Sequence, residues 1–132
     1  MNIPLSRRSI RTRLAYRFLR ALKKLNKQRT DTCRRYHMVK MAAYASMASA
    51  VGSKRAWSRA LLWKIRNRGL NRWLVKRNKS LGLEEAHQEL RKLVPGGEVM
   101  DVLSLFDETA HYIKCLTSQV QIMRNIVDFY SA

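Results

Sequence analysis

The chain has 132 residues, with 27 Lys and Arg against 9 Asp and Glu, and a net charge of +18. That length allows one small domain with an arm but excludes two separate cores. The hydrophobic content of 46% excludes a simple disordered polyelectrolyte, and the sequence contains no run of about 20 apolar residues that would span a membrane.

The charge is divided unevenly along the chain. Residues 1–83 hold 23 basic residues and one acid, Asp31, whereas residues 84–132 hold 4 basic residues and 8 acids. A cationic arm of this kind attracts polyanions or import receptors. An Arg-rich start with some Ser and Thr also fits a mitochondrial presequence, which stays an alternative.

Residues 1–53 are predicted to form a basic amphipathic helical region. Between residues 6 and 29, apolar residues recur at helical spacing from Ile10 to Leu25, and Arg and Lys fill the other faces. Such a helix can pack on a neighbour, bind phosphate or an anionic surface, or direct nuclear import. A second helix is expected over residues 30–53, with Met and Tyr side chains that pack. The import candidates are Arg7, Arg8, Arg11 and Arg13.

Residues 54–80 are predicted to be a degenerate basic region that contains three Trp, and a helix is the simpler account of its pattern. The spacing of Trp57, Leu61 and Ile65 predicts one buried face with cations opposite. Stacking of Trp on unpaired bases is the alternative.

Residues 81–129 are predicted to form a helix, a turn and a longer helix. Pro95-Gly96-Gly97 ends the first helix, because proline cannot continue it and glycine favours a turn. Residues 98–129 then carry apolar side chains at steps of 3 and 4. The first helix covers less than half of this stripe, so a second chain or the N-terminal helices must cover the rest.

The segments LRKLVPGG (90–97) and SLFDETAHYIKCLTSQVQIM (104–123) resemble the helix-loop-helix region of plant basic helix-loop-helix proteins. AWSRALLWKIR (56–66) resembles one branch, the atypical plant proteins of the increased-leaf-inclination-binding type. The resemblance implies an all-α fold in which the C-terminal helix-loop-helix dimerises as a parallel four-helix bundle. The expected dimer interface comprises Leu83, Leu90, Leu93, Val94, Leu105, Phe106, Tyr112, Ile113, Leu116, Val120 and Met123.

The positions that read DNA in that family are degenerate here. The His, Glu and Arg that read the E-box fall on Arg72, Lys76 and Arg77, so only the Arg is kept. Lys76 carries donors only and cannot accept from the amines of cytosine or adenine. The following Arg pair falls on Lys79 and Ser80, and Gly82 weakens the junction to the next helix. Sequence-specific E-box reading is therefore not expected.

Metal and enzyme functions are set aside. Cys33 with His37, and His111 with Cys115, have the spacing of zinc ligands, but such pairs arise easily by chance and lie far apart. No phosphate loop, nucleophile elbow or paired-carboxylate arrangement occurs, because neighbouring acids on a helix point apart. No cofactor, small-molecule substrate or membrane partner is expected.

These patterns predict a nuclear, non-enzymatic transcriptional regulator. It is expected to pair with another basic helix-loop-helix or helix-loop-helix factor and to block that factor's DNA binding, as a heterodimer or possibly also as a homodimer. The resemblance implies restraint of brassinosteroid- and gibberellin-promoted cell elongation. The alternative is a basic RNA-binding or ribosome-associated protein, since arginine and tryptophan interleave in the arm.

Overall fold

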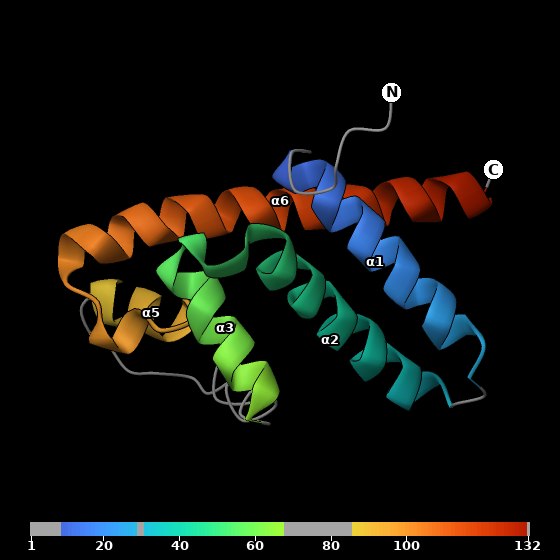
Figure 1. Ribbon diagram of the computed structural model, residues 1–132, viewed down its shortest axis with the longest axis horizontal. Helices are drawn as coiled ribbons and strands as arrows, with labels where there is room; N and C mark the ends of the chain where they lie inside the picture. The colour runs from blue at the N-terminus through green and yellow to red at the C-terminus, as the bar shows by residue number, and fades with distance from the viewer. Residues whose placement is uncertain (1–8, 29–30, 68–85, 132) are drawn as a thin grey trace. The chain divides into compact units, whose positions relative to one another are not determined.

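The computed structural model describes residues 9–28, 31–67 and 86–131, and it confirms the predicted all-α class. Over these residues the chain folds into helices and turns, and no strand occurs (Figure 1). None of the described helices is both long enough and apolar enough to cross a membrane. In chain order, the elements are α1 (Ile10–Asn26), α2 (Thr32–Val51), η2 (Gly52–Lys54), α3 (Ala56–Arg66), α5 (Ala86–Leu93), η3 (Gly97–Val99) and α6 (Val102–Ser131).

Each of the three long helices begins at a polar side chain that caps its free backbone amides. Ser9 accepts a hydrogen bond from the Thr12 amide at 3.2 Å, at the start of α1. Asp31 accepts from the Arg34 amide at 2.7 Å before α2, and Asp101 accepts from the Ser104 amide at 2.9 Å before α6. The Ser104 hydrogen bonds lower the pKa of Asp101. A cap of this type stabilises a helix start by about 1 kcal/mol.

The chain divides into two compact units that share α6. One unit comprises Met1–Ala50 with Cys115–Ala132, and the other comprises Val51–Lys114. The predicted division into residues 1–53, 54–80 and 81–129 depends on charge and motif instead of contacts, and it stays a prediction.

The first unit is built on a close pair of helices. α1 and α2 lie side by side in Figure 1. Leu14 and Phe18 of α1 are buried, and α2 offers mostly small buried side chains with one large one, Met47. The Arg13 Nε donates to the Ala50 carbonyl at 3.0 Å, so this import candidate also ties α1 to the end of α2. The small buried side chains of α2 favour dense packing around it.

The second unit contains α3, α5, η3 and the first part of α6. α5 ends at Leu93, and Gly96 takes the left-handed backbone conformation with φ of 77°, as the predicted turn at Pro95-Gly96-Gly97 requires. A Cβ on Gly96 would lie 2.8 Å from the Cβ of Ala60, so α3 passes close to this turn. The Arg91 guanidinium closes the turn by donating to the carbonyls of Gly97 and Met100.

Candidate protein-interaction surface

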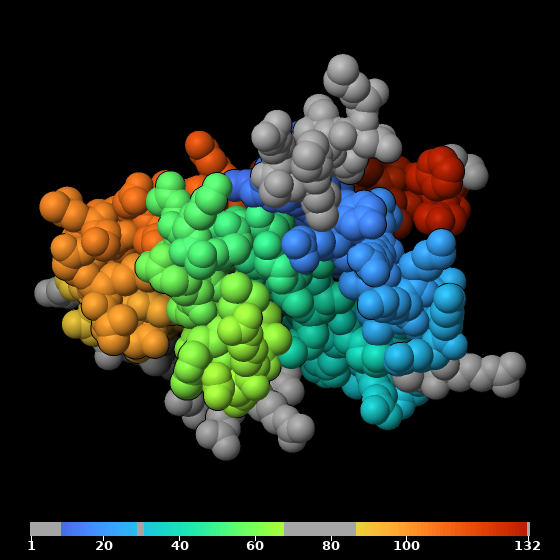
Figure 2. Space-filling view, viewed as in Figure 1, coloured from blue at the N-terminus to red at the C-terminus, as the bar shows by residue number. Residues whose placement is uncertain are grey.

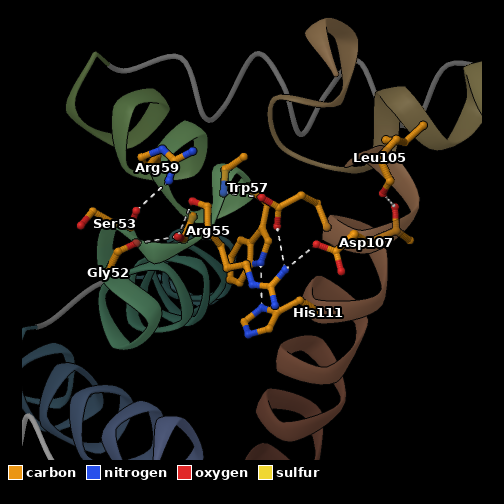
Figure 3. Close-up of polar contacts among 12 residues, drawn as sticks. Gly52, Ser53, Arg55, Trp57, Arg59, Leu105, Asp107 and His111 are labelled. Carbon is orange, nitrogen blue, oxygen red and sulfur yellow. Dashed lines mark hydrogen bonds and ion pairs between the residues drawn. The ribbon is translucent and has the colours of Figure 1, made fainter. Parts of the chain in front are cut away.

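The second unit is organised around Trp57, at the start of α3. Its side chain is 0% exposed, and its ring centroid lies 4.9 Å from that of Tyr112 on α6. The indole Nε1 donates a hydrogen bond of 3.0 Å to the Nδ1 of His111 (Figure 3). The predicted packing role of this Trp agrees with its burial, whereas Trp63 on the same helix is 63% exposed. A buried indole with a satisfied N–H is a strong anchor between two helices.

A pair of carboxylates on α6 holds the beginning of α3. The Glu108 carboxylate accepts from the backbone amide of Ala56, the first residue of α3, whose own cap position provides no side-chain bond. The Arg55 guanidinium lies 2.9 Å from the Asp107 carboxylate, and at 3.7 Å it is within ion-pair range of Glu108. A negative charge at the start of a helix is stabilising, because the free amides there carry partial positive charge. Glu108 therefore caps α3 from another helix.

The start of α3 also forms hydrogen bonds with the preceding turn, η2. The Ser58 hydroxyl is buried and donates to the Gly52 carbonyl at 2.5 Å, and Arg59 donates to the Ser53 carbonyl at 2.7 Å (Figure 3). These bonds join η2 to α3. The contacts of its first residues with α6 and with η2 together fix the direction of α3 within the second unit.

Burial lowers the pKa of His111, and the positive charge of Arg55 acts in the same direction. Because the Nδ1 accepts from Trp57, the imidazole must be neutral in the folded state. Below the unfolded-state pKa of about 6.5, the unfolded chain binds a proton that the folded chain resists, so stability falls as pH falls. We expect the free energy of unfolding, from urea titrations followed by tryptophan fluorescence, to drop between pH 7 and pH 5.

The variant His111→Asn provides the control for this pH dependence. Its amide oxygen can still accept from the Trp57 indole, but it does not titrate. The decrease in stability should therefore be smaller in this variant than in the unchanged protein. Equal decreases in the two proteins would assign the pH dependence to other groups.

α6 carries two neighbouring stripes of side chains, and only one of them is covered. The buried stripe comprises Leu105, Glu108, Tyr112, Cys115, Gln119 and Ile122. The exposed stripe comprises Val102, Phe106, Ile113, Val120 and Val127, whose exposed fractions lie between 42% and 60%. Thr109, Leu116 and Met123 continue the exposed stripe and are partly covered. Both stripes advance in steps of 3 and 4, the spacing of side chains that meet a second helix.

The structure divides the described members of the predicted dimer interface into three groups by their exposure. Val94, Leu105 and Tyr112 are buried within the chain. Leu90, Leu116 and Met123 are partly covered, and Leu83 lies outside the described residues. The residues that remain exposed are Leu93, Phe106, Ile113 and Val120.

The other predicted site residues are only partly described. The degenerate DNA-reading positions Arg72, Lys76, Arg77 and Lys79 lie outside the described residues, as do Arg7 and Arg8. Arg11 is exposed on α1. Within the described ranges, no three His, Cys, Asp or Glu side chains are grouped where they could hold a metal ion.

Three contributing residues were not predicted from the sequence. Asp107 and Glu108 matched the family pattern, but nothing in it indicated that they would hold α3. His111, the polar partner of Trp57, stands out in the sequence only through its zinc-ligand spacing with Cys115. Its position one residue before Tyr112, on the same turn of the helix, was the one sign in the sequence that it could also lie near a side chain packed on Tyr112.

Gln119 is a buried polar residue in the buried stripe. It is 3% exposed, and neither its amide oxygen nor its amide nitrogen has a hydrogen-bond partner among the described residues. An unsatisfied buried amide costs about 1–3 kcal/mol. Gln119→Leu keeps a similar volume and removes that cost, so it is expected to raise the free energy of unfolding by about 1–2 kcal/mol.

Urea denaturation of the full chain measures this effect. The matched control is Gln121→Leu, since Gln121 is exposed on the same helix, and it should change stability by less than about 0.5 kcal/mol. Loss of stability in the Gln119 variant would mean that the amide has a partner in solution.

Comparison with known proteins identifies relatives of the chain. A family model described as the IBH1-like N-terminal domain matches residues 7–69, which contain α1, α2, η2 and α3. Transcription factor IBH1 of Oryza sativa subsp. japonica is 34% identical, over 89% of this chain and 78% of the relative. Transcription factor bHLH146 of Arabidopsis thaliana is 34% identical, over 81% of this chain and 75% of the relative. No solved structure matches the chain significantly.

These relatives place the chain among plant transcriptional regulators, a class of transcription factors and not of enzymes. It belongs to the IBH1-like family, which confirms the resemblance seen in AWSRALLWKIR. Over a shorter stretch, transcription factor IBH1-like 1 of Arabidopsis thaliana is 58% identical, over 31% of this chain.

Proposed function

We propose that the chain is a negative regulator that acts in the nucleus by pairing with another helix-loop-helix factor and keeping that factor from DNA. The observation that carries the proposal is the exposed stripe of α6. An apolar stripe of this length on a charged protein is typical of a surface that binds another helix.

The spacing of the exposed stripe suits a helical partner. Its side chains alternate steps of 4 and 3 from Val102 to Val127, an average repeat of about 3.5 residues, the repeat of helices that wind around each other. At about 1.5 Å per residue the stripe is roughly 38 Å long. Fully burying a side chain such as Ile113 contributes about 1.5–3 kcal/mol, so a helix covering the whole stripe would bind firmly.

The second half of α6 also provides a place for a partner side chain. Val120, Met123, Arg124 and Val127 line a hollow of about 320 Å³, together with Asp128. The first four residues follow the spacing i, i+3, i+4 and i+7, and they are neighbours on the helix surface. Four such residues form the hole that receives one side chain of a facing helix in coiled-coil packing. Arg124 and Asp128 flank the hole with charges that can select the partner.

The proposed effect on DNA follows from the residues of the basic segment. Lys76 occupies the position of the Glu that accepts from base amines, and a lysine can only donate. A mixed dimer then has one competent basic arm, and each lost bidentate contact costs about 1–3 kcal/mol. The proposed restraint of brassinosteroid- and gibberellin-promoted cell elongation is supported by the family resemblance alone.

Co-purification against a panel of plant helix-loop-helix factors tests the pairing, and sedimentation of the isolated chain separates homodimer from heterodimer.

A gel-shift experiment tests the effect on DNA. Adding the chain to an E-box-binding partner should reduce the shifted E-box band. The chain alone should bind DNA without E-box preference, and that binding should weaken steeply with salt. An E-box preference by the chain alone would contradict the proposal. Tight, salt-resistant RNA binding would support an RNA-binding function in its place.

A further inference from the structure

The outer face of α1 combines cations with exposed apolar side chains. Leu19 is 50% exposed and Tyr16 is 46% exposed, although both are side chains that a helix usually packs. A hollow of about 600 Å³ lies along this face, and its lining consists of Tyr16, Leu19, Arg20, Lys23, Lys24 and Lys27.

A second hollow of about 630 Å³ adjoins the first, because Leu19 and Lys23 line both. Its other walls include Leu22 of α1, Val39 of α2 and Tyr130 of α6, all within the first unit. Figure 2 shows α1, in blue, at the surface beside α2, in teal. The two hollows form a groove along α1, here called the α1 groove.

The charge of the α1 groove is not balanced from within the unit. The described residues of the first unit hold eleven Lys and Arg but only two acids, Asp31 and Asp128. Arg20, Lys23, Lys24 and Lys27 form no ion pair with any described residue. Clustered like charges repel each other, and an anionic ligand would relieve that repulsion.

A ligand of the α1 groove must therefore supply both negative charge and apolar surface. Nucleic-acid phosphates would pair with the lysines but would leave the Leu19 side chain facing a polar backbone. A helix with carboxylates along its edges and leucines along one face would satisfy both parts of the groove. From Tyr16 to Lys27 the groove runs about 17 Å, enough for three turns of a bound helix.

We propose that the α1 groove binds an acidic amphipathic helix of a partner protein. The cations attract its carboxylates and speed the encounter, and Leu19 with Tyr16 receives its apolar side chains. The groove shares no residue with the exposed stripe of α6, although its wall residue Tyr130 lies one helical step beyond Val127. The cations and the apolar side chains of α1 that carry the proposal do not belong to the helix-loop-helix surface.

Fluorescence anisotropy of the full chain tests this with a labelled synthetic peptide of Glu and Leu arranged to form an acidic amphipathic helix. A peptide of the same composition in scrambled order keeps the charge and loses the apolar face. We expect the amphipathic peptide to bind at least about tenfold more tightly, since burying one leucine alone is worth about that factor. Equal binding of the two peptides would overturn the proposal.

Variants of the chain locate the binding. Leu19→Ser and Tyr16→Ser should each weaken the amphipathic peptide about tenfold, and Lys23→Glu combined with Lys27→Glu should abolish binding at low salt. Circular dichroism confirms folding, which these exposed positions should not disturb. Arg66→Glu is the control, because Arg66 is an exposed cation on α3, and it should leave the affinity nearly unchanged.

Two other outcomes would also overturn the proposal. If the charge reversals weaken binding but both serine variants do not, the groove acts through charge alone. If a DNA duplex or a phosphatidylserine vesicle binds more tightly than the peptide and depends on Leu19, the ligand is a nucleic acid or a membrane and not a protein helix.

Discussion

Replacing Trp57 with alanine is expected to destabilise the protein by about 3–5 kcal/mol, the usual cost of removing a fully buried large aromatic side chain. The change removes the ring that packs on Tyr112 and leaves the His111 Nδ1 without its donor. The free energy of unfolding of a small domain is only about 5–15 kcal/mol, so this loss would remove a large part of it. Urea denaturation followed by circular dichroism measures it.

Trp63→Ala is the matched control for this prediction. Trp63 lies on the same helix but is 63% exposed, so its loss should change stability by less than about 1 kcal/mol. Trp57→Phe would separate packing from hydrogen bonding, because it keeps an aromatic ring and removes only the indole N–H. If Trp57→Ala and Trp63→Ala have equal effects, α3 is not anchored through Trp57 in solution.

Ile113→Asp is expected to weaken pairing with a helix-loop-helix partner at least about a hundredfold. The substitution places an unpaired carboxylate where the proposed partner helix covers the exposed stripe, and burying such a charge is costly. Ile113 is 54% exposed in the isolated chain, so the variant should still fold. Isothermal titration against the co-purified partner measures the change in affinity.

Asn125→Asp adds the same charge to the exposed polar face of α6, roughly opposite the stripe, and should leave pairing unchanged. The same change at Leu116 would be harder to interpret, because Leu116 is partly covered within the chain and its replacement would also affect folding. If Ile113→Asp and Asn125→Asp pair equally well, the partner does not cover the exposed stripe.

Local sequence patterns located the helices closely. The turn at Pro95-Gly96-Gly97 ends α5 as predicted, because proline and a left-handed glycine leave little choice. The longest helix was predicted over residues 98–129 but begins at Val102, since η3 and the cap Asp101 occupy the preceding residues. Helix boundaries of this kind depend on which side chain captures the free amides.

The sequence did not predict which apolar residues of α6 are covered within the chain and which stay exposed. The apolar residues of this helix all lie at helical spacing, so periodicity alone marks one broad apolar face. Contacts with the rest of the chain cover Leu105 and Tyr112 and leave Phe106 and Ile113 exposed. No local rule distinguishes Leu105 from Phe106, because which one is covered depends on the face of α6 against which the rest of the chain packs.

The sequence by itself determined the helical class, the excess positive charge of the first 83 residues and the family, because composition, periodicity and motif are local properties of the chain. Only the tertiary structure decided that Trp57 is an anchor while Trp63 is exposed, and that Glu108 caps α3. It alone also left one stripe of α6 uncovered. Such outcomes depend on contacts between residues about fifty positions apart, and the geometry of those contacts is set by packing and not by spacing along the chain.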